Sequence, residues 1–157
     1  MILSAAALSA GVSHAAPEPA KQAPAAAQQE VLRGNSKIVA EYVDAAFNEK
    51  NAEKAARFLD GDKMIQHNTA FPNGFGVIRG YIQSPAAQSL SYERGLIMEK
   101  GDLVMVHGRY KGWNGKNMIA VDIFRVQNGK VVEHWDVMQE EVPANKTVSG
   151  LPMFPAQ

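Results

Sequence analysis

The amino-acid sequence predicts an α+β domain in which about three N-terminal helices pack on one face of an antiparallel sheet. Apolar residues recur with helical spacing in the first half of the chain, but after residue 90 they alternate with polar residues, as in strands with one buried face. Glycine-containing turn sequences separate the expected strands at short intervals. Helices followed by an antiparallel meander are typical of α+β domains.

The first expected helix is the best defined. Asn35 or Ser36 stands where a capping side chain is needed. A second, shorter helix is expected over residues 51–59, and a third over 76–84, where Pro85 would stop it. The apolar residues of the first helix have the spacing of one buried stripe: Val39, Tyr42, Val43, Ala46 and Phe47.

Four long strands are expected in the second half of the chain, after a short strand over residues 64–68. They cover residues 91–99, 103–110, 117–127 and 130–139. The breaks between them are Lys100-Gly101-Asp102, Asn114-Gly115 and Asn128-Gly129. Because Asn-Gly readily adopts the positive φ of a hairpin turn, these strands should form a meander.

Composition limits the partners of the protein. Lys and Arg number 16 and Asp and Glu also number 16, so the net charge is zero and gives no reason to expect nucleic acid or an anionic membrane. No apolar run approaches the length of a membrane span. The sequence contains no cysteine, which excludes disulfides and thiolate chemistry.

Residues 1–16 are typical of a truncated signal peptide. An apolar stretch rich in Ala, Leu and Ser is followed by Ser13-His14-Ala15, which has the small residues that signal peptidase requires, so we expect cleavage near Ala15 or Ala16. A disordered Ala-rich tail is the alternative. Residues 17–30 have the composition of a flexible linker, which leaves 31–157 for the folded domain. The expected location is periplasmic or secreted.

The last expected hairpin carries a distinctive sequence. It runs VDIFRVQNGKVVEHWDV over residues 121–137, and the segments IQHN (65–68), FPNG (71–74) and LVMVH (103–107) precede it in the chain. These segments, in this order, resemble the SnoaL-like polyketide-cyclase branch of the nuclear transport factor two-like superfamily. The resemblance covers residues 31–139 and implies a bent sheet curled into a cone, closed by three helices, with a pocket inside.

The resemblance also implies catalytic positions. In catalytic relatives an acidic residue of the last strand is the general acid/base, and it corresponds to Asp136. His134 matches a position in the pocket wall. Asp122 lies near the second catalytic residue of some cyclases, which have His there. His107 and Arg109 lie where related hydrolases place a charged pair, although here both residues are basic.

A second group of positions matches the polar wall of the pocket in related hydrolases. Gln66 and Asn68 correspond to those positions. Because neighbouring strand residues face opposite ways, either His67 or this pair points inward, and we favour the pair. Tyr42, on the first helix, is a further candidate for substrate binding.

Strand periodicity gives an independent view of the last hairpin. His134 and Asp136 share one face of their strand. If the hairpin contains no bulge, Asp136 lies opposite Val121, whereas Asp122 lies opposite Trp135 on the other face. One bulge would reverse this arrangement, and bulges are frequent beside active sites.

Each acidic candidate has a structural alternative. Asp136 could be a strand-end carboxylate that accepts backbone or arginine hydrogen bonds, and Asp122 could pair with Arg109 or Arg125. The histidines could be satisfied, partly buried side chains. A metal site is not expected, because the clustered ligand spacing of structural zinc motifs is absent.

The sequence and the resemblance together predict a SnoaL-like enzyme that needs no cofactor and performs acid/base chemistry on an apolar carbonyl compound. The reaction would be an aldol-type cyclisation, an isomerisation or an elimination. Asp136 would remove a proton next to the carbonyl, and His107, His134 or an amide of Gln66 or Asn68 would stabilise the enolate oxygen. The remaining candidates for substrate binding are His67, Arg109, Asp122 and Tyr42.

Two further expectations concern binding and assembly. The alternative to an enzyme is a non-catalytic secreted module of the same fold that binds a small ligand or a partner chain. A homodimer is expected through the outer face of the sheet, where Trp135, with Phe124 beside it, would present large apolar groups.

Overall fold

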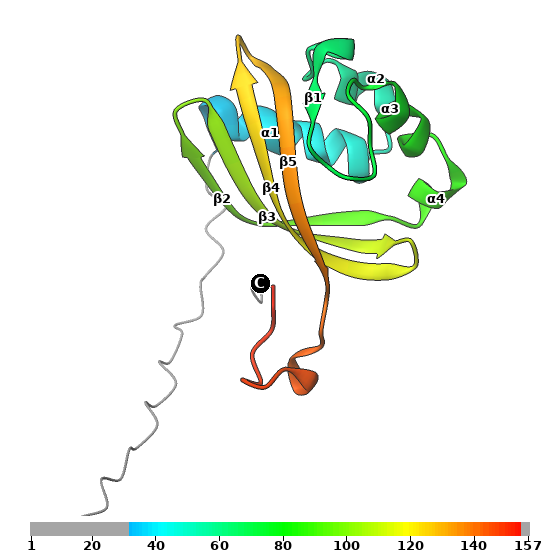
Figure 1. The fold of residues 1–157 in the computed structure, drawn as a ribbon, viewed down its shortest axis with the longest axis vertical. Helices are drawn as coiled ribbons and strands as arrows, with labels where there is room; N and C mark the ends of the chain where they lie inside the picture. The colour runs from blue at the N-terminus through cyan, green and yellow to red at the C-terminus, as the bar shows by residue number, and fades with distance from the viewer. Residues whose placement is uncertain (1–31, 155–157) are drawn as a thin grey trace, which may run out of the picture.

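A curved five-stranded sheet is the framework of the protein (Figure 1). The computed structural model describes residues 32–154, so the predicted signal peptide and linker lie outside the described residues. The strand order is β1 (Ile65–Gln66), β5 (Lys130–Glu140), β4 (Lys116–Gln127), β3 (Leu103–Trp113) and β2 (Ser91–Lys100). The four long strands form the expected antiparallel meander, whereas the short β1 pairs parallel with β5.

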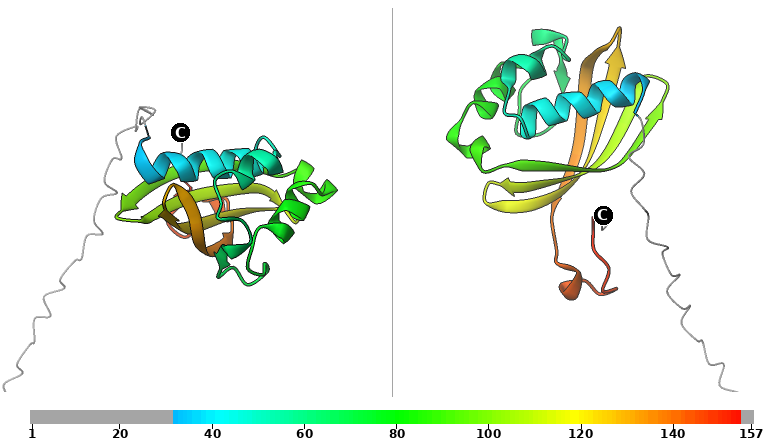
Figure 2. Two further views of the ribbon diagram at one scale, coloured as in Figure 1. Left: turned by 90° about the horizontal axis from the view of Figure 1, so that it is seen from above. Right: turned by 180° about the vertical axis from the view of Figure 1, so that it is seen from behind.

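The helices lie over one face of this sheet, and α1 crosses it (Figure 2). They are α1 (Gly34–Phe47), α2 (Ala52–Ala56), α3 (Gly76–Ile82) and α4 (Pro85–Gln88). The third helix ends before Pro85, as expected, but Pro85 also begins α4. Proline suits a first helical position because the N–H that it lacks has no partner within the helix. No helix within the described residues has the length and apolar character needed to cross a membrane.

The N-terminus of α1 is capped from a distant strand. The prediction of a cap by Asn35 or Ser36 was wrong: both the backbone N–H and the hydroxyl of Ser36 donate to Glu99 of β2, each at 2.8 Å. A carboxylate suits this position because the first N–H groups of a helix lack partners and form the positive end of the helix dipole. Glu99 therefore fixes α1 to the sheet.

The hairpin turns form where the sequence predicts them. Asn114 and Gly115 both have positive φ, at 48° and 79°, and so do Asn128 and Gly129, at 51° and 73°. Asn and Gly adopt this region at low cost, and its twist matches that of the flanking strands.

The last hairpin contains a β-bulge, so its residue pairing differs from that of a regular hairpin with a two-residue turn. Val126 pairs with Val131, but Arg125 pairs with Glu133, which leaves one extra residue on β5. Beyond the bulge, Asp122 lies opposite Asp136, so the hairpin has the arrangement expected with a bulge and not the pairing of Val121 with Asp136 expected without one. Phe124 likewise faces the helices and is 3% exposed, not outward beside Trp135.

The other face of the sheet is partly covered by the C-terminal segment. After β5 the chain passes through a 3₁₀ turn at Ala144–Lys146 and returns along the side of the sheet away from the helices (Figure 1). Phe154 is 2% exposed and packs against His107 and over Gly95, where the missing side chain leaves room for its ring.

Candidate functional site

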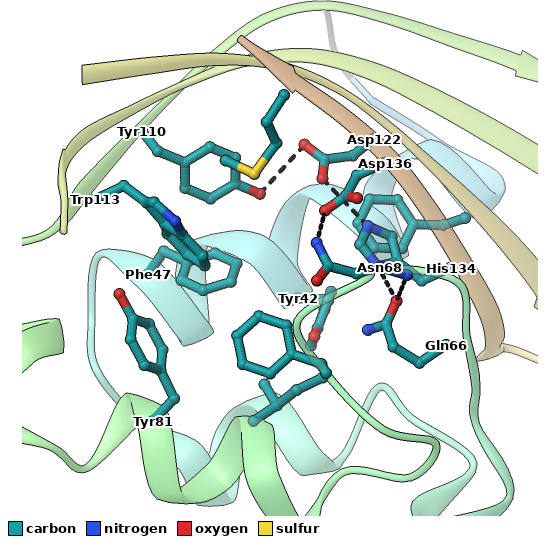
Figure 3. A pocket seen from close by; sticks show the side chains of 14 residues that line it. Tyr42, Phe47, Gln66, Asn68, Tyr81, Tyr110, Trp113, Asp122, His134 and Asp136 are labelled. Carbon is teal, nitrogen blue, oxygen red and sulfur yellow. Dashed lines mark hydrogen bonds and ion pairs between the residues drawn. The ribbon is translucent and has the colours of Figure 1, made fainter. Parts of the chain in front are cut away.

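A pocket lies between the inner face of the sheet and the helices (Figure 3). Its empty space is about 470 Å³, counting the open mouth. The lining is mainly aromatic and has no Lys or Arg among the described residues. It consists of Tyr42, Phe47, Gln66, Asn68, Phe71, Ile78, Tyr81, Tyr110, Trp113, Asp122, Phe124, His134, Asp136 and Met138.

One end of the pocket is built from aromatic rings that come from separate parts of the chain. The ring of Trp113 lies 5.3 Å from that of Tyr81, 6.2 Å from that of Phe71 and 5.5 Å from that of Tyr110, measured between centroids. Phe47 of α1 meets Tyr110 edge-on at 5.3 Å. Such a lining favours flat apolar ligands.

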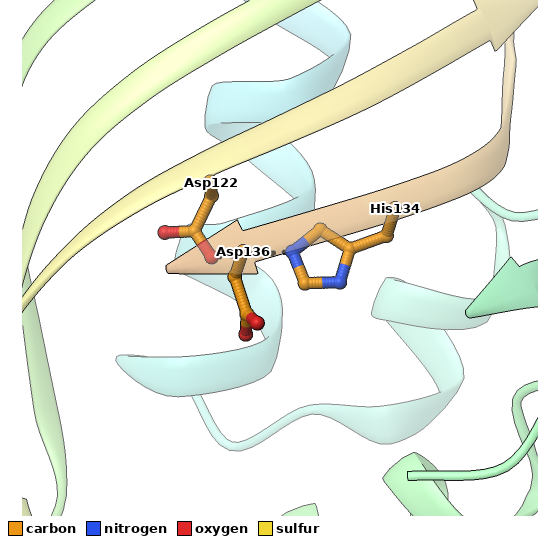
Figure 4. Close-up of side chains that lie close together, drawn as sticks. All are labelled: Asp122, His134 and Asp136. Carbon is orange, nitrogen blue, oxygen red and sulfur yellow. Dashed lines mark hydrogen bonds and ion pairs between the residues drawn. The ribbon is translucent and has the colours of Figure 1, made fainter. Parts of the chain in front are cut away.

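The other end holds three side chains that can exchange protons (Figure 4). Asp122 comes from β4, and His134 and Asp136 come from β5. One nitrogen or oxygen atom of each lies within 4.8 Å of the corresponding atoms of the other two. Asp122 is 1% exposed, so the bulge in the last hairpin brings a buried carboxylate to the two residues that the sequence had already paired.

The hydrogen bonds of Gln66 fix the position of a proton on His134. The side-chain oxygen of Gln66 accepts from the backbone N–H of Asn68 at 3.0 Å, which establishes which end of the amide is the oxygen. The same oxygen lies 2.8 Å from Nδ1 of His134. A carbonyl oxygen cannot donate, so Nδ1 carries the hydrogen.

His134 and Asp122 therefore share a further proton. Nε2 of His134 lies 3.2 Å from Oδ1 of Asp122. Because the hydrogen on Nδ1 is already committed to Gln66, a hydrogen bond here requires a proton on Nε2 or on the carboxyl group. The two forms are an ion pair and a neutral pair with the same total charge. The geometry of the Asp122–His134 pair thus allows it to hold a proton inside the pocket.

Tyr110 completes the surroundings of Asp122. Its hydroxyl donates to Oδ2 of Asp122 at 3.2 Å. Burial, and next the charge of Asp122, raise the pKa of Tyr110 well above its ordinary value, so the phenol remains a donor. Burial and Asp122 raise the pKa of Tyr42 in the same way. Asp122 is thus held by Tyr110 and His134 and not by Arg109 or Arg125.

Tyr110 is one of the residues that sequence reasoning missed, together with the aromatic lining residues Phe71, Tyr81 and Trp113. Alternation along its strand with the buried Val104 and Val106 places it on the inner face, which was a usable signal. Its contact with Asp122 could not be inferred, because that contact depends on a separate register shift between Tyr110 and Trp113 in the pairing of β3 with β4.

Asp136 has a single side-chain partner among the described residues. The amide nitrogen of Asn68 donates to its Oδ2, and both Gln66 and Asn68 line the pocket, whereas His67 does not. The remaining oxygen of Asp136 makes no hydrogen bond to a described side chain. A carboxylate that is held at one oxygen and available at the other can accept a proton from a bound molecule.

Three predicted site residues lie on the opposite face of the sheet. His107 packs against the ring of Phe154 at 5.3 Å between centroids, and Arg109 forms ion pairs with Glu93 and Glu141 at 2.9 and 2.6 Å. Both occupy the alternate positions of β3 that face away from the helices. The placement of His107 and Arg109 in the pocket is therefore corrected.

His67 is the third of these residues. Its ring stacks on that of Trp135 at 4.8 Å and pairs with Glu133 at 2.9 Å, outside the pocket. The structure brings the other predicted site residues together in the pocket: Tyr42 of α1, Gln66 of β1, Asn68 just after β1, Asp122 of β4, and His134 and Asp136 of β5.

Two solved structures with the same architecture are covered by this chain over 90% or more of their own length. An NTF2-like protein of unknown function from Cytophaga hutchinsonii has a TM-score of 0.59 at 15% identity, covering 70% of this chain and 94% of that one. A protein from Kribbella flavida, provisionally assigned as a ketosteroid isomerase, has a TM-score of 0.57 at 15% identity, covering 78% and 90%. At such identities the likeness establishes the fold alone.

A third similar structure is a protein from Bacillus cereus that is provisionally assigned as a polyketide cyclase. Its TM-score is 0.54 at 20% identity, covering 64% of this chain and 71% of that one. No curated protein matches the chain in sequence. The family model of the SnoaL-like domain matches residues 39–134, more than half of the chain. With this match and the cone-shaped fold, the chain belongs to the SnoaL-like domain family.

Proposed function

We propose that this protein is an enzyme that transfers protons within a small apolar carbonyl compound, without a cofactor. The observation that carries the proposal is the carboxylate of Asp136, which stands in an aromatic pocket within 4.8 Å of a His–Asp pair that holds a proton. Enolisation requires a base and, close to it, a group that can supply a proton to the developing enolate oxygen. The similar structures assigned as cyclase and isomerase support this class of reaction.

In the proposed reaction Asp136 accepts a proton from the carbon next to the carbonyl. The electrons of the broken C–H bond form the C=C bond of an enolate, whose charge rests on the oxygen. The proton of the Asp122–His134 pair stabilises that oxygen, and Tyr110 keeps Asp122 in place. Return of the proton to another carbon gives isomerisation. Attack of the enolate carbon on a second carbonyl gives cyclisation, in which the resulting alkoxide takes the proton back from Asp136.

Proton exchange with solvent tests the proposal without knowledge of the natural substrate. Enolisation replaces hydrogen next to a carbonyl with deuterium in D₂O, and NMR follows this for 2-tetralone and 2-acetylnaphthalene. The wild-type protein should accelerate exchange of at least one such ketone, and Asp136→Asn should not. Asp60→Asn is a matched control, since Asp60 is exposed and remote from the pocket lining.

A non-catalytic binding module is the second candidate, and one observation favours it. The rings of Phe71, Tyr81 and Trp113 contact one another and narrow the pocket, as in a site that retains a flat ligand. Quenching of Trp113 fluorescence by either ketone, with no exchange above the buffer rate, would identify the protein as a binder. Trp113→Phe separates this signal from that of Trp135.

We also propose that the protein forms a homodimer through the outer face of the sheet. One row of cross-strand neighbours on that face is apolar from β2 to β5: Met98, Met105, Ile123 and Trp135. In the next row Val137 is 76% exposed. An exposed apolar sheet face of this kind is well suited to a self-complementary contact.

Export remains a proposal that rests on the sequence of the N-terminal segment. The support is the apolar stretch followed by Ser13-His14-Ala15. Mass spectrometry of protein from a native extract should find an N-terminus at Ala16 or Pro17. Recovery of cytosolic protein that retains Met1 would contradict export.

A further inference from the structure

Asp122, His134 and Asp136 have an arrangement that proton transfer alone does not require. In each of them a neutral neighbour binds one polar atom and leaves another available to the cluster (Figure 3). These bonds join Gln66 to Nδ1 of His134, Tyr110 to Oδ2 of Asp122 and Asn68 to Oδ2 of Asp136. Metal-binding histidines and carboxylates are oriented in this way, by hydrogen bonds to the atoms that do not bind the metal.

The spacing of the available atoms suits a small divalent cation. Two ligand atoms on one tetrahedral zinc ion are about 3.4 Å apart, given metal–ligand distances of about 2.0–2.1 Å. Nε2 of His134 and Oδ1 of Asp122 are 3.2 Å apart. The third ligand, Asp136, supplies an oxygen within 4.8 Å of both, so its carboxylate must move closer to join the other two on one ion.

The charge of the pocket also favours binding of a divalent cation. The proton shared by Asp122 and His134 balances one of the two carboxylates, and no Lys or Arg is present among the described lining residues to balance the other, Asp136. Asp122 is 1% exposed, so its charge is not relieved by bulk water. A divalent cation bound to two carboxylates and a neutral imidazole makes the cluster neutral.

We propose that Asp122, His134 and Asp136 bind a zinc ion, with the fourth position open to the aromatic pocket. Three protein ligands of mixed nitrogen and oxygen type and one open position are typical of non-structural zinc sites. This site does not depend on the proposed reaction. It has a consequence for that reaction, however, because zinc occupies the carboxylate and the imidazole that must be free for proton transfer. Zinc should therefore inhibit it.

Calorimetry with zinc chloride and chelator-treated protein tests the site directly, with no organic ligand present. The wild type should bind one zinc ion in the pocket, and His134→Gln or Asp122→Asn should weaken binding by about 100-fold or more. Tyr110→Phe should weaken it by about 10-fold, since loss of a group that only orients a ligand costs about 10–100-fold. The matched controls His67→Gln and His107→Gln should bind as the wild type does, because both histidines lie on the other face.

Two results would overturn the proposal. One is the absence of binding at millimolar zinc, and the other is equal binding by the wild type and His134→Gln. Should a pocket variant fail to fold, NMR of the wild-type histidine rings decides, since zinc must shift Nε2 of His134 and leave His67 unshifted. Deuterium exchange measured in chelator tests the enzyme separately, so either proposal can fail alone.

Discussion

Asp122 of β4 lies directly opposite Asp136 of β5, and both carboxylates face the same pocket. Like charges in opposite positions of a sheet destabilise it, so this pairing has a cost for the fold. The cost is offset by donors on both sides, from Tyr110 and His134 to Asp122 and from Asn68 to Asp136. Residues that lower stability without a structural benefit are those expected at a functional site.

Tyr110→Phe should destabilise the protein, because it removes a donor from a carboxylate that is 1% exposed. The expected loss is about 1–3 kcal/mol of the free energy of unfolding. Tyr92→Phe is the matched control, since the hydroxyl of Tyr92 is buried with no hydrogen-bond partner among the described residues. Urea unfolding of both variants checks this. Equal losses would show that Asp122 does not need Tyr110.

Glu99→Gln should destabilise the protein by about 1 kcal/mol at neutral pH, because it weakens the cap of α1. Glu41→Gln, on the exposed side of α1, should cost less than about 0.5 kcal/mol, the value of an i,i+4 pair. Thermal unfolding of both variants measures the difference.

The effect of Glu99 should depend on pH. Hydrogen bonds from the hydroxyl and then the backbone N–H of Ser36 hold the pKa of Glu99 below its ordinary value of 4.5. A lowered pKa adds stability above the unfolded value, and this is lost as the pH falls through the folded value. The gap between wild type and Glu99→Gln should therefore shrink below about pH 4.5. A constant gap down to pH 3 would contradict the capping role.

The part of the fold that the sequence predicts is the part that local chemistry decides. The positive φ of Asn128-Gly129 and the apolar stripe of α1 follow from neighbouring residues alone. The cap of α1 does not, since Ser36 and Glu99 are 63 residues apart. The bulge beside Arg125 cannot be located from the alternation of apolar and polar side chains either. One extra residue in the strand leaves an acceptable apolar pattern both before and after it.

For the same reason, only part of the site could be predicted. Strand alternation was enough to place His134 and Asp136 together. The resemblance to the family was enough to select Gln66 and Asn68. The position of Asp122 required the bulge, and the outward position of His107 conflicted with a role that had been assigned by resemblance alone.

Gly108→Ala should destabilise the protein, because a methyl group at Gly108 would overlap the hydroxyl and ring of Tyr92. That ring is held between Phe47 and Tyr110, so it cannot move freely, and overpacking of this kind costs about 1–3 kcal/mol. Gly80→Ala in α3 meets nothing within 4 Å and should stabilise by about 0.5–1 kcal/mol. Opposite shifts in the melting temperature are expected. A neutral Gly108→Ala would show that the sheet and α1 are loosely packed.

Val137→Lys should convert the proposed homodimer into a monomer. Val137 is 76% exposed in a single chain, so the substitution should leave the monomer's fold intact while it places a charge in the dimer contact. Val77→Lys, at a position of α3 that is 50% exposed, is the control. Light scattering should report a dimer for wild type and control. A monomeric wild type at micromolar concentration would contradict the assembly.

The most direct test of the proposed function is deuterium exchange catalysed by Asp136→Asn. The amide keeps the shape of the carboxylate and can still accept from Asn68, but it cannot take up a proton. If Asp136 is the base, the exchange rate should fall by roughly two to four orders of magnitude. Ketone binding should persist, and stability should stay equal or rise as the charge opposite Asp122 is removed. Unchanged exchange in a variant that unfolds more easily would instead make Asp136 a structural carboxylate and contradict the account.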